Sequence, residues 1–336
     1  MSATAVMLLA AGRGTRLGPL GLSLPKPLVP ICGYPAIRFG LAACARAGLD
    51  DVVVNLHHLG DRLRQTLGDG AADGVRIRYS VEPDLLGTGG GIAQARALLG
   101  AGRVLVINGK VVADVDLAAV LRGHVAAAGQ GAIGTLVLRD DPDPRRWGAI
   151  GVDATGRVVS ILAARSPIPA EGPVTERMFT GIQVLEPALL DRLSPVPCDV
   201  IRDAYIPALE GGARIAALRL GGYFAEHSTP ARYLAGNLDL LATPTLVSHA
   251  PGPLTGVDPS AATAGARLVP PYRIAAGAII EPGAEVGPAA VIGAGARVRA
   301  GARVFQAVVW PDALVEGEVG RAVVTPEGTV AIDAGS

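Results

Sequence analysis

The sequence contains few aromatic residues and few cysteines. Aromatic side chains make up 4% of its 336 residues, whereas 50% of the residues are hydrophobic, so aliphatic side chains must build most of any core. The three cysteines, Cys32, Cys44 and Cys198, lack the spacing of a metal site, and their odd number argues against a disulfide framework. We therefore expect a cytoplasmic protein in a reducing compartment.

Excess charge and long hydrophobic runs are lacking as well. The 30 basic and 30 acidic side chains cancel, so the composition shows no electrostatic footprint for nucleic acid or for an anionic membrane. No apolar run approaches the ~18 residues that a membrane-spanning helix needs. The first residues lack the basic region of a secretory signal peptide. We expect a soluble protein without nucleic-acid or membrane partners.

Lysine is the scarcest of the charged residues. It occurs only at Lys26 and Lys110, so 28 of the 30 basic residues are arginine. A position that drifted freely in such a composition would be expected to hold arginine. The two lysines are therefore candidates for function.

Short apolar runs alternate with segments of helical spacing from residue 4 to about 245. We expect strands at Thr4–Leu9, Asp51–Asn55 and Val104–Ile107, and helices at Ala36–Ala47, Asp61–Leu67 and Ile92–Leu99. This alternation predicts a doubly wound, mostly parallel α/β sheet with a Rossmann-like arrangement. Ligands of such sheets bind at the carboxyl ends of the strands, so a site is expected after Leu9, Asn55 and Ile107.

A six-residue repeat follows a segment rich in Pro, Gly, Ser, Thr and Ala, which we interpret as a linker over residues 246–266. Apolar side chains recur at Leu268, Ile274, Ile280, Val286, Ile292, Val298, Val304 and Trp310. One inward apolar residue in each hexapeptide is typical of a left-handed parallel β-helix, in which each face of a triangular coil contributes a strand. We expect domains at 1–245 and 267–325 and a tail at 326–336.

A glycine-rich loop follows the first expected strand. It reads Leu9-Ala10-Ala11-Gly12-Arg13-Gly14-Thr15-Arg16-Leu17, and Pro25-Lys26-Pro27 comes after it. Glycines let backbone N–H groups close around phosphates, and Arg16 and Lys26 add the positive charge that a triphosphate requires. Such a loop is weak evidence alone, because ordinary turns between strands and helices also contain glycine.

Several motifs in order make the pattern specific. The loop and the Pro-Lys-Pro segment resemble the signature of the sugar-1-phosphate nucleotidyltransferases, which make nucleoside-diphosphate sugars. The resemblance continues through Glu82–Gly90, Phe179–Ile182 and Gly222–Tyr233, and the hexapeptide repeat resembles that of mannose-1-phosphate guanylyltransferases. It implies attack by a sugar 1-phosphate on the α-phosphorus of an NTP, with release of pyrophosphate and with Mg²⁺ neutralising the phosphate oxygens.

The resemblance also implies roles for individual residues. Arg16 and Lys26 would contact the phosphates. Glu82 would order the loop that ends at Gly90, and the glycines of this loop would approach the base. The nucleotide-binding residues would be Leu9, Ala10, Ala11, Gly12, Gly14, Thr15, Glu82, Gly87, Thr88, Gly89, Asn108 and Gly109. The sugar side would include Gly148, Thr180, Gly181 and Arg165, which stands where the family usually has a lysine for the sugar phosphate.

The family's two magnesium ligands are replaced. An aspartate in an Asn-Gly-Asp segment corresponds here to Lys110, and an aspartate in a Trp-x-Asp-x-Gly-Thr-Pro segment corresponds to Glu226. Lysine offers no acceptor and its charge repels Mg²⁺, which prefers hard oxygen ligands in tight octahedral geometry. The family's metal site is therefore expected to be absent.

Two functions remain open on these residues. In the first, the Lys110 ammonium neutralises phosphate charge where Mg²⁺ would lie, and the chain makes a nucleoside-diphosphate sugar. In the second, Lys110 pairs with Glu226, and the chain binds a nucleotide sugar as a catalytically silent regulatory or sensor subunit.

The β-helix suggests a third class of function, acyl transfer. That chemistry needs a histidine base on the coil, and all five histidines precede residue 268, so we exclude it. An apolar coil with open strand edges profits from capping by a partner, which predicts a homo-oligomer formed through the β-helix.

Overall fold

The structure is a computed structural model that describes residues 4–12 and 14–332 of the chain. The described residues divide into two compact units. The first unit comprises residues 4–12, 40–111 and 115–222, and the second comprises residues 14–39, 112–114 and 223–332. The domain boundaries expected from composition stay predictions.

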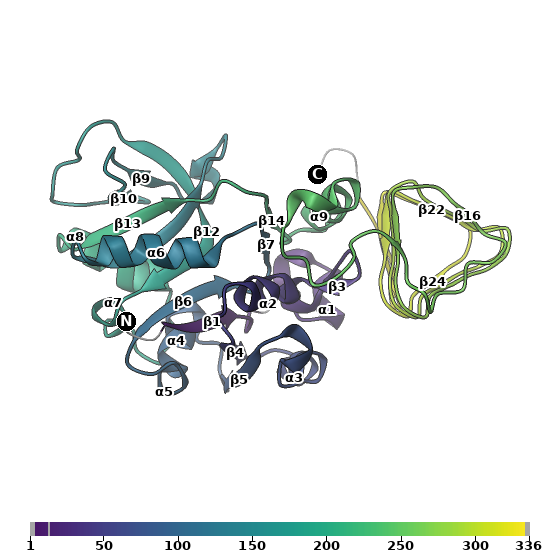
Figure 1. Cartoon of the computed structure of the whole chain (residues 1–336), viewed down its shortest axis with the longest axis horizontal. Helices are drawn as coiled ribbons and strands as arrows, with labels where there is room; N and C mark the ends of the chain where they lie inside the picture. The colour runs from purple at the N-terminus through teal and green to yellow at the C-terminus, as the bar shows by residue number, and fades with distance from the viewer. Residues whose placement is uncertain (1–3, 13, 333–336) are drawn as a thin grey trace. The chain divides into compact units, whose positions relative to one another are not determined.

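The first unit is built on one ten-stranded sheet (Figure 1). Its strand order is β11-β10-β9-β12-β6-β1-β4-β5, with β8 pairing with β12 and β13 pairing with β8. The strands are β1 (Thr4–Leu9), β4 (Asp51–Leu56), β5 (Arg76–Val81), β6 (Arg103–Asn108), β8 (Ala132–Arg139), β9 (Ile150–Val152), β10 (Val158–Ile161), β11 (Ala164–Arg165), β12 (Thr175–Leu185) and β13 (Arg214–Arg219). β1, β4, β5 and β6 are mutually parallel, whereas β12 is antiparallel to β6 and β8.

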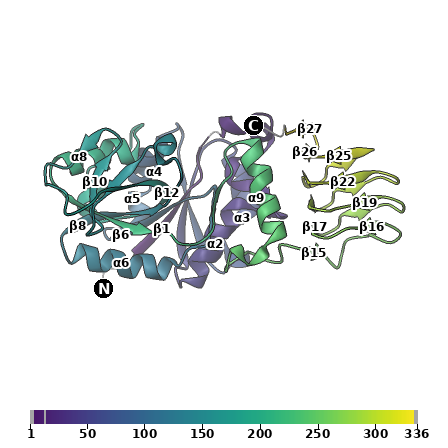
Figure 2. The same cartoon turned by 90° about the horizontal axis from the view of Figure 1, so that it is seen from above.

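Helices cover both faces of this sheet. They are α2 (Ala36–Arg46, from Gly40 onward in this unit), α3 (Gly60–Leu67), α4 (Gly87–Gln94), α5 (Arg96–Leu99), α6 (Leu117–Ala128), α7 (Pro187–Leu190), α8 (Ile206–Glu210) and the π-helical turn η5 (Val200–Tyr205). Successive side chains of a strand point to opposite faces. Met7 and Val106 accordingly pack with Ile92 of α4, while a methyl group at Gly40 of α2 would lie 3.2 Å from the side chain of Leu8. Figure 2 shows α6 and α4 on opposite sides of the sheet. The predicted doubly wound sheet is confirmed.

The second unit joins short elements to the β-helix. The short elements are η1 (Thr15–Leu17), α1 (Leu20–Ser23), η2 (Lys26–Leu28), β2 (Pro30–Ile31), β3 (Tyr34–Pro35), β7 (Val111–Ala113, from Val112 onward in this unit), β14 (Phe224–Glu226), α9 (Pro230–Ala242) and η6 (Pro244–Leu246). One buried cluster connects α9 with the coil, and it contains Tyr233, Leu240, Val308 and Trp310. The coil is therefore packed on α9 within this unit.

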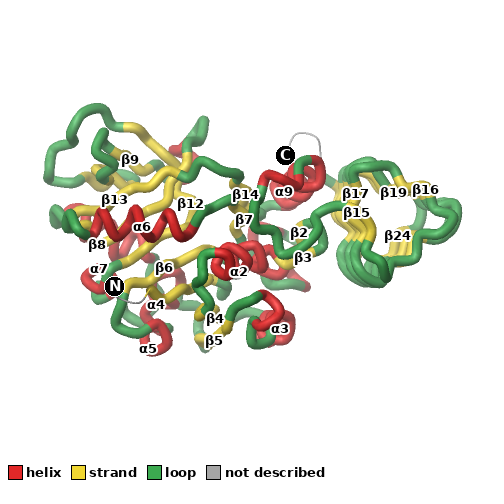
Figure 3. The backbone as a smooth tube through the Cα atoms, in the orientation of Figure 1, coloured by secondary structure: helices red, strands yellow, loops and turns green. Residues whose placement is uncertain are grey.

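The coil consists of three stacked sheets, whose short strands and turns are visible in Figure 3. The first contains β15 (Gly256–Val257), β17 (Tyr272–Ile274), β20 (Ala290–Ile292), β23 (Ala307–Val309), β26 (Ala322–Thr325) and β27 (Gly328–Ala331). The second contains β16 (Arg267–Leu268), β19 (Glu285–Val286), β22 (Arg303–Phe305) and β25 (Glu318–Gly320), and the third contains β18 (Ile279–Ile280), β21 (Arg297–Val298) and β24 (Leu314–Val315). Parallel pairing of Arg267 with Glu285 and of Glu285 with Arg303 shows the 18-residue turn of three hexapeptides. The predicted parallel β-helix is confirmed.

Seven of the eight expected inward positions lie in or against the coil's interior cluster. Trp310 does not, and that prediction is wrong. Val309 takes the inward position because the chain advances only five residues from Val304 to the next inward side chain. The Trp310 ring turns outward against Tyr233 of α9, where its N–H group finds a hydrogen-bond acceptor that an aliphatic interior lacks.

Within the described ranges 4–12 and 14–332, no helix combines the length and the apolar character that crossing a bilayer requires.

Candidate nucleotide site

Three strand ends of the first unit are tied together by buried side chains. The N–H group of Ala10, just after β1, donates to Asn55 Oδ1 of β4 at 2.6 Å. Asn55 Nδ2 donates to Glu82 Oε1, just after β5, at 2.6 Å, and Glu82 Oε2 accepts from the Leu86 N–H group at 3.1 Å. Asn55 and Glu82 are both 2% exposed, so these bonds replace water. Sequence reasoning missed Asn55; its signal was a polar residue ending an apolar strand.

Glu82 also marks the start of α4. The prediction treated Glu82–Gly90 as a loop, but the helix α4 begins at Gly87. The residue before it, Leu86, donates its N–H group to the Glu82 carboxylate. A carboxylate at a helix N-terminus satisfies a free N–H group and opposes the helix dipole. Hydrogen bonding to Glu82 therefore helps a glycine-rich segment to be helical.

The glycines of α4 make room for protein backbone. A Cβ atom at Gly87 would lie 2.6 Å from the carbonyl oxygen of Cys198, and one at Gly90 would overlap the carbonyl oxygen of Val196. The Gly89 N–H group donates to Cys198 O at 3.0 Å. Packing against residues 196–198 thus requires glycine here, and contact with a nucleotide base stays a prediction.

Thr88 is committed to the same neighbouring segment. Its hydroxyl donates to Asp199 Oδ2 at 3.0 Å and accepts from the Val200 N–H group at 2.9 Å. The side chain therefore anchors the start of η5, and its nucleotide-binding role stays a prediction.

The end of β6 carries the Asn-Gly-Lys segment. The Gly109 N–H group donates to Leu9 O at 2.9 Å, which brings this segment beside the start of the glycine-rich loop. Gly181 has a φ of +81°, and a Cβ atom there would overlap the side chain of Asn108. The structure therefore brings together Leu9, Asn108, Gly109 and Gly181 from three strands, with the half-buried Lys110 next in the chain.

The remaining sugar-side residues are more dispersed. Thr180 is buried at a bulge of β12, where its hydroxyl donates to Val137 O at 2.7 Å and accepts from the Ile182 N–H group at 3.3 Å. Gly148 has a φ of +84° and follows η4 (Pro144–Trp147). Arg165 is exposed on β11, separated from β12 by β10 and β9, and lines a shallow pocket. Their contact with a sugar phosphate stays a prediction.

The second unit holds the other half of the glycine-rich loop. Gly14 has a φ of +70°, and its carbonyl oxygen accepts from the Leu17 N–H group at 3.0 Å. Arg16 is exposed, whereas Lys26 is only 7% exposed. Arg13 and the side chain of Thr15 lie outside the described part of the chain.

Glu226 is held between two cations of the same unit. Its Oε1 atom lies 3.8 Å from Lys26 Nζ. Its Oε2 atom accepts a hydrogen bond from the Ser228 hydroxyl and lies 3.5 Å from Arg232 Nη1. Arg232 stands in the first turn of α9, where its N–H group donates to the Thr229 hydroxyl at 3.3 Å. Sequence reasoning missed Arg232 and Ser228, because only the fold turns them toward Glu226.

These contacts do not fit the magnesium site of the family. Both oxygens of Glu226 face donors or cations, and Lys110 has no acceptor to offer. Among the residues that the structure describes, no three His, Cys, Asp or Glu side chains form a cluster that could hold a metal ion. The expected pairing of Lys110 with Glu226 joins residues of different units and stays a prediction.

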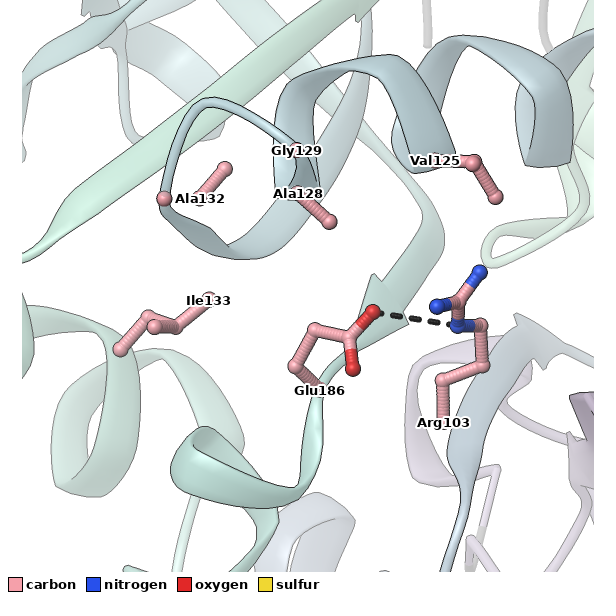
Figure 4. A pocket seen from close by; sticks show the side chains of 8 residues that line it. Arg103, Val125, Ala128, Gly129, Ala132, Ile133 and Glu186 are labelled. Carbon is pink, nitrogen blue, oxygen red and sulfur yellow. Dashed lines mark ion pairs between the residues drawn. The ribbon is translucent and has the colours of Figure 1, made fainter. Parts of the chain in front are cut away.

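A pocket of the first unit lies at the opposite edge of the sheet, where β6 and β8 begin (Figure 4). Arg103 Nε lies 3.1 Å from Glu186 Oε1, and His124 Nε2 lies 2.9 Å from the same oxygen. Burial lowers the pKa of His124, although the hydrogen bond that its ring donates to Glu186 opposes this effect. The pocket lies at the amino ends of β6 and β8, whereas the glycine-rich loop follows the carboxyl end of β1.

Comparison with known proteins decides the family. Residues 5–193 match the nucleotidyl transferase family. The chain belongs to this family. It is 33% identical to a mannose-1-phosphate guanylyltransferase of Mycobacterium tuberculosis over 82% of this chain and 76% of that protein. It is 30% identical to a mannose-1-phosphate guanyltransferase of Schizosaccharomyces pombe over 76% of this chain and 71% of that protein.

A third relative differs in both base and sugar. An N-acetylmuramate alpha-1-phosphate uridylyltransferase of Neisseria meningitidis is 48% identical, over 34% of this chain and 49% of its own length. The resemblance to sugar-1-phosphate nucleotidyltransferases is therefore confirmed, while these relatives disagree on the base and the sugar.

Proposed function

We propose that this nucleotidyl transferase makes a nucleoside-diphosphate sugar from an NTP and a sugar 1-phosphate, releasing pyrophosphate. The supporting observation is that the chain matches the family and keeps the glycine-rich loop and a buried, charge-paired Lys26. A buried ammonium is costly without a counter-charge; Glu226 supplies one here, and the phosphates of a bound nucleotide would supply another.

In this proposal the loop binds the triphosphate and two lysines supply positive charge. Backbone N–H groups around Gly12 and Gly14 and the Arg16 guanidinium bind phosphate oxygens. Lys26 moves its ammonium from Glu226, 3.8 Å away, to the phosphates, whose negative charge replaces that of the carboxylate. Arg232 and Ser228 then keep the Glu226 carboxylate paired.

Lys110 would replace part of what a divalent cation supplies. Its segment follows β6 and is bonded to Leu9 at the start of the loop. A fixed ammonium there stabilises negative charge that develops on the phosphates during in-line attack. We therefore propose turnover with reduced dependence on Mg²⁺.

A second candidate is a silent binder of nucleotide sugars. It is favoured by the engagement of both Glu226 oxygens with protein groups, which leaves neither oxygen of this carboxylate ready for a metal ion. In this case the chain would bind a nucleotide sugar without turnover and act as a sensor or regulatory subunit.

An assay of pyrophosphate release separates the two candidates. GTP, UTP, dTTP, CTP and ATP are each supplied with mannose 1-phosphate and with other sugar 1-phosphates. By similarity to the mannose-1-phosphate guanylyltransferases we expect GTP and mannose 1-phosphate to be used best. Release by the unmodified chain excludes the silent candidate, whereas tight nucleotide-sugar binding without any release excludes the active one.

Self-association through the β-helix is also proposed. The second of the coil's sheets carries alternating charges outside, at Arg267, Glu285 and Arg303, with neighbouring ion pairs at 3.0 and 3.6 Å. The first sheet packs on α9. We therefore expect association through the open strand edges rather than through a coil face, and light scattering that shows only monomer at micromolar concentration would contradict it. A cytoplasmic location and the lack of nucleic-acid and membrane partners stay predictions.

A further inference from the structure

Buried hydrogen bonds link the β-helix to the segment that carries Lys26. Trp310 Nε1 donates to the Tyr233 hydroxyl at 2.9 Å, and that hydroxyl donates to the Pro30 carbonyl oxygen at 2.6 Å. Trp310 is 2% exposed and Tyr233 is fully buried, and their rings meet edge to face at 6.3 Å. All of these residues belong to the second unit. The link therefore runs from the coil through α9 to β2.

The direction of each hydrogen bond is fixed by chemistry. Burial raises the pKa of Tyr233 far above its ordinary value, so the phenol stays protonated. Its single proton goes to Pro30 O, and the hydroxyl oxygen is left to accept from the indole N–H group, which can only donate. The Pro30 carbonyl oxygen and the indole N–H group thus hold the hydroxyl together, one as acceptor and one as donor.

A second contact holds the same segment to α9. Asn237 Oδ1 accepts from the Cys32 N–H group at 2.8 Å, and Asn237 Nδ2 donates to Tyr233 O at 2.9 Å. Tyr233 and Asn237 are four residues apart, so they lie on one face of the helix. Residues 30–32 are therefore fastened to α9 at two points.

Lys26 lies four residues before Pro30, with little slack between them. The backbone of η2 is closed by bonds from Leu28 N to Pro25 O at 2.8 Å and from Val29 N to Lys26 O at 3.3 Å. The first turn of α9 also holds Glu226, through Arg232. One helix thus positions both Lys26 and its counter-charge.

We propose that Trp310 of the β-helix is a positioning residue for Lys26, acting through the hydroxyl of Tyr233. The inference rests on the proposed function only for the phosphate-binding role of Lys26. Displacement of a catalytic group by about 1 Å can lower a rate by about 100-fold, so an outer hydrogen bond of this kind matters for turnover.

The two lysines permit a test that does not require turnover. Competitive acetylation with acetic anhydride, read by mass spectrometry, compares Lys26 with Lys110 in one sample. In Trp310→Phe, which keeps an aromatic ring but removes the N–H group, we expect acetylation of Lys26 to rise by about threefold or more, with Lys110 unchanged. Where the chain turns over, kcat should fall by about tenfold with KM nearly constant.

A double-mutant cycle tests the route through Tyr233. Tyr233→Phe should also increase Lys26 acetylation, and adding Trp310→Phe to it should change little, because the hydroxyl that transmits the effect is already gone. Val308→Ala is the matched control: Val308 is fully buried in the same cluster but takes no part in these hydrogen bonds. It should lower stability and leave Lys26 acetylation unchanged.

Each result supports or overturns the inference. Unchanged Lys26 acetylation in folded Trp310→Phe, or an equal increase in Val308→Ala, would overturn it. If Trp310→Phe does not fold, Tyr233→Phe alone must raise Lys26 acetylation for the inference to stand. A raised Lys26 acetylation in a chain without turnover would support the positioning role while the proposed function fails.

Discussion

Replacing Glu226 by glutamine removes a negative charge that lies 3.8 Å from a buried ammonium. The Lys26 side chain is 8% exposed, so water cannot replace the lost carboxylate, whereas Arg232, at 30%, can rehydrate. Breaking a buried ion pair from one side typically costs 3–5 kcal/mol. The Lys26–Glu226 separation of 3.8 Å is longer than a hydrogen bond. We therefore expect Glu226→Gln to lower the unfolding free energy by about 3 kcal/mol, the lower end of this range.

Urea denaturation followed by circular dichroism measures this loss. Glu285→Gln is the matched control, because Glu285 also contacts two arginines, Arg267 and Arg303, but on the coil exterior. It should cost less than about 1 kcal/mol. Inorganic triphosphate should stabilise Glu226→Gln more than the unmodified chain, since a bound anion restores the missing charge. A loss no larger than that of the control would refute the view that Lys26 depends on Glu226.

Further predictions concern the glycines, the strand-end network and acid stability. Gly90→Ala should lose about 2 kcal/mol or more in urea denaturation because its methyl group would overlap the Val196 carbonyl, whereas Gly12→Ala, with no atom within 4 Å of its Cβ, should stay within about 0.5 kcal/mol. Asn55→Ala leaves the buried Ala10 N–H group and an oxygen of the Glu82 carboxylate without their hydrogen bonds, and the unfolding free energy should fall by about 3 kcal/mol. A fall of less than about 1 kcal/mol would contradict this prediction. Burial tends to raise the pKa of Asp153, but hydrogen bonds from a hydroxyl and from backbone N–H groups outweigh it and lower the pKa to about 2. Because the pKa is lower in the folded state, the ionised carboxylate stabilises the fold above pH 4, and about 2 kcal/mol of unfolding free energy should be lost between about pH 4 and pH 2. Acid titration of Asp153→Asn should not show this loss.

Local patterns predicted the elements that depend on local chemistry. The first strand has the predicted bounds Thr4–Leu9, and the aliphatic hexapeptide positions from Ile274 to Val304 fill the coil. Both follow from periodicity, since a side chain's direction is set by its place in the strand. The position of Lys110 after β6 follows from the same reasoning.

The rest depends on contacts between distant parts of the chain. Gly87 was assigned to base recognition, yet its missing side chain makes room for Cys198, more than 100 residues away. Trp310 does not point into the coil because the chain advances only five residues from Val304 to the next inward side chain, Val309. The Tyr233 hydroxyl also offers the Trp310 N–H group an acceptor outside the coil. The two cations around Glu226 likewise come from η2 and α9, and no spacing along the sequence reveals them.

Metal dependence of turnover tests the central claim most directly. Pyrophosphate release is measured with Mg²⁺ and after its removal by EDTA, for the unmodified chain and for Lys110→Asp. If the Lys110 ammonium stands in for the cation, the unmodified chain should keep its rate within about tenfold after chelation, and Lys110→Asp should become strictly dependent on Mg²⁺. Release that occurs only in Lys110→Asp with Mg²⁺, and never in the unmodified chain, would contradict the account.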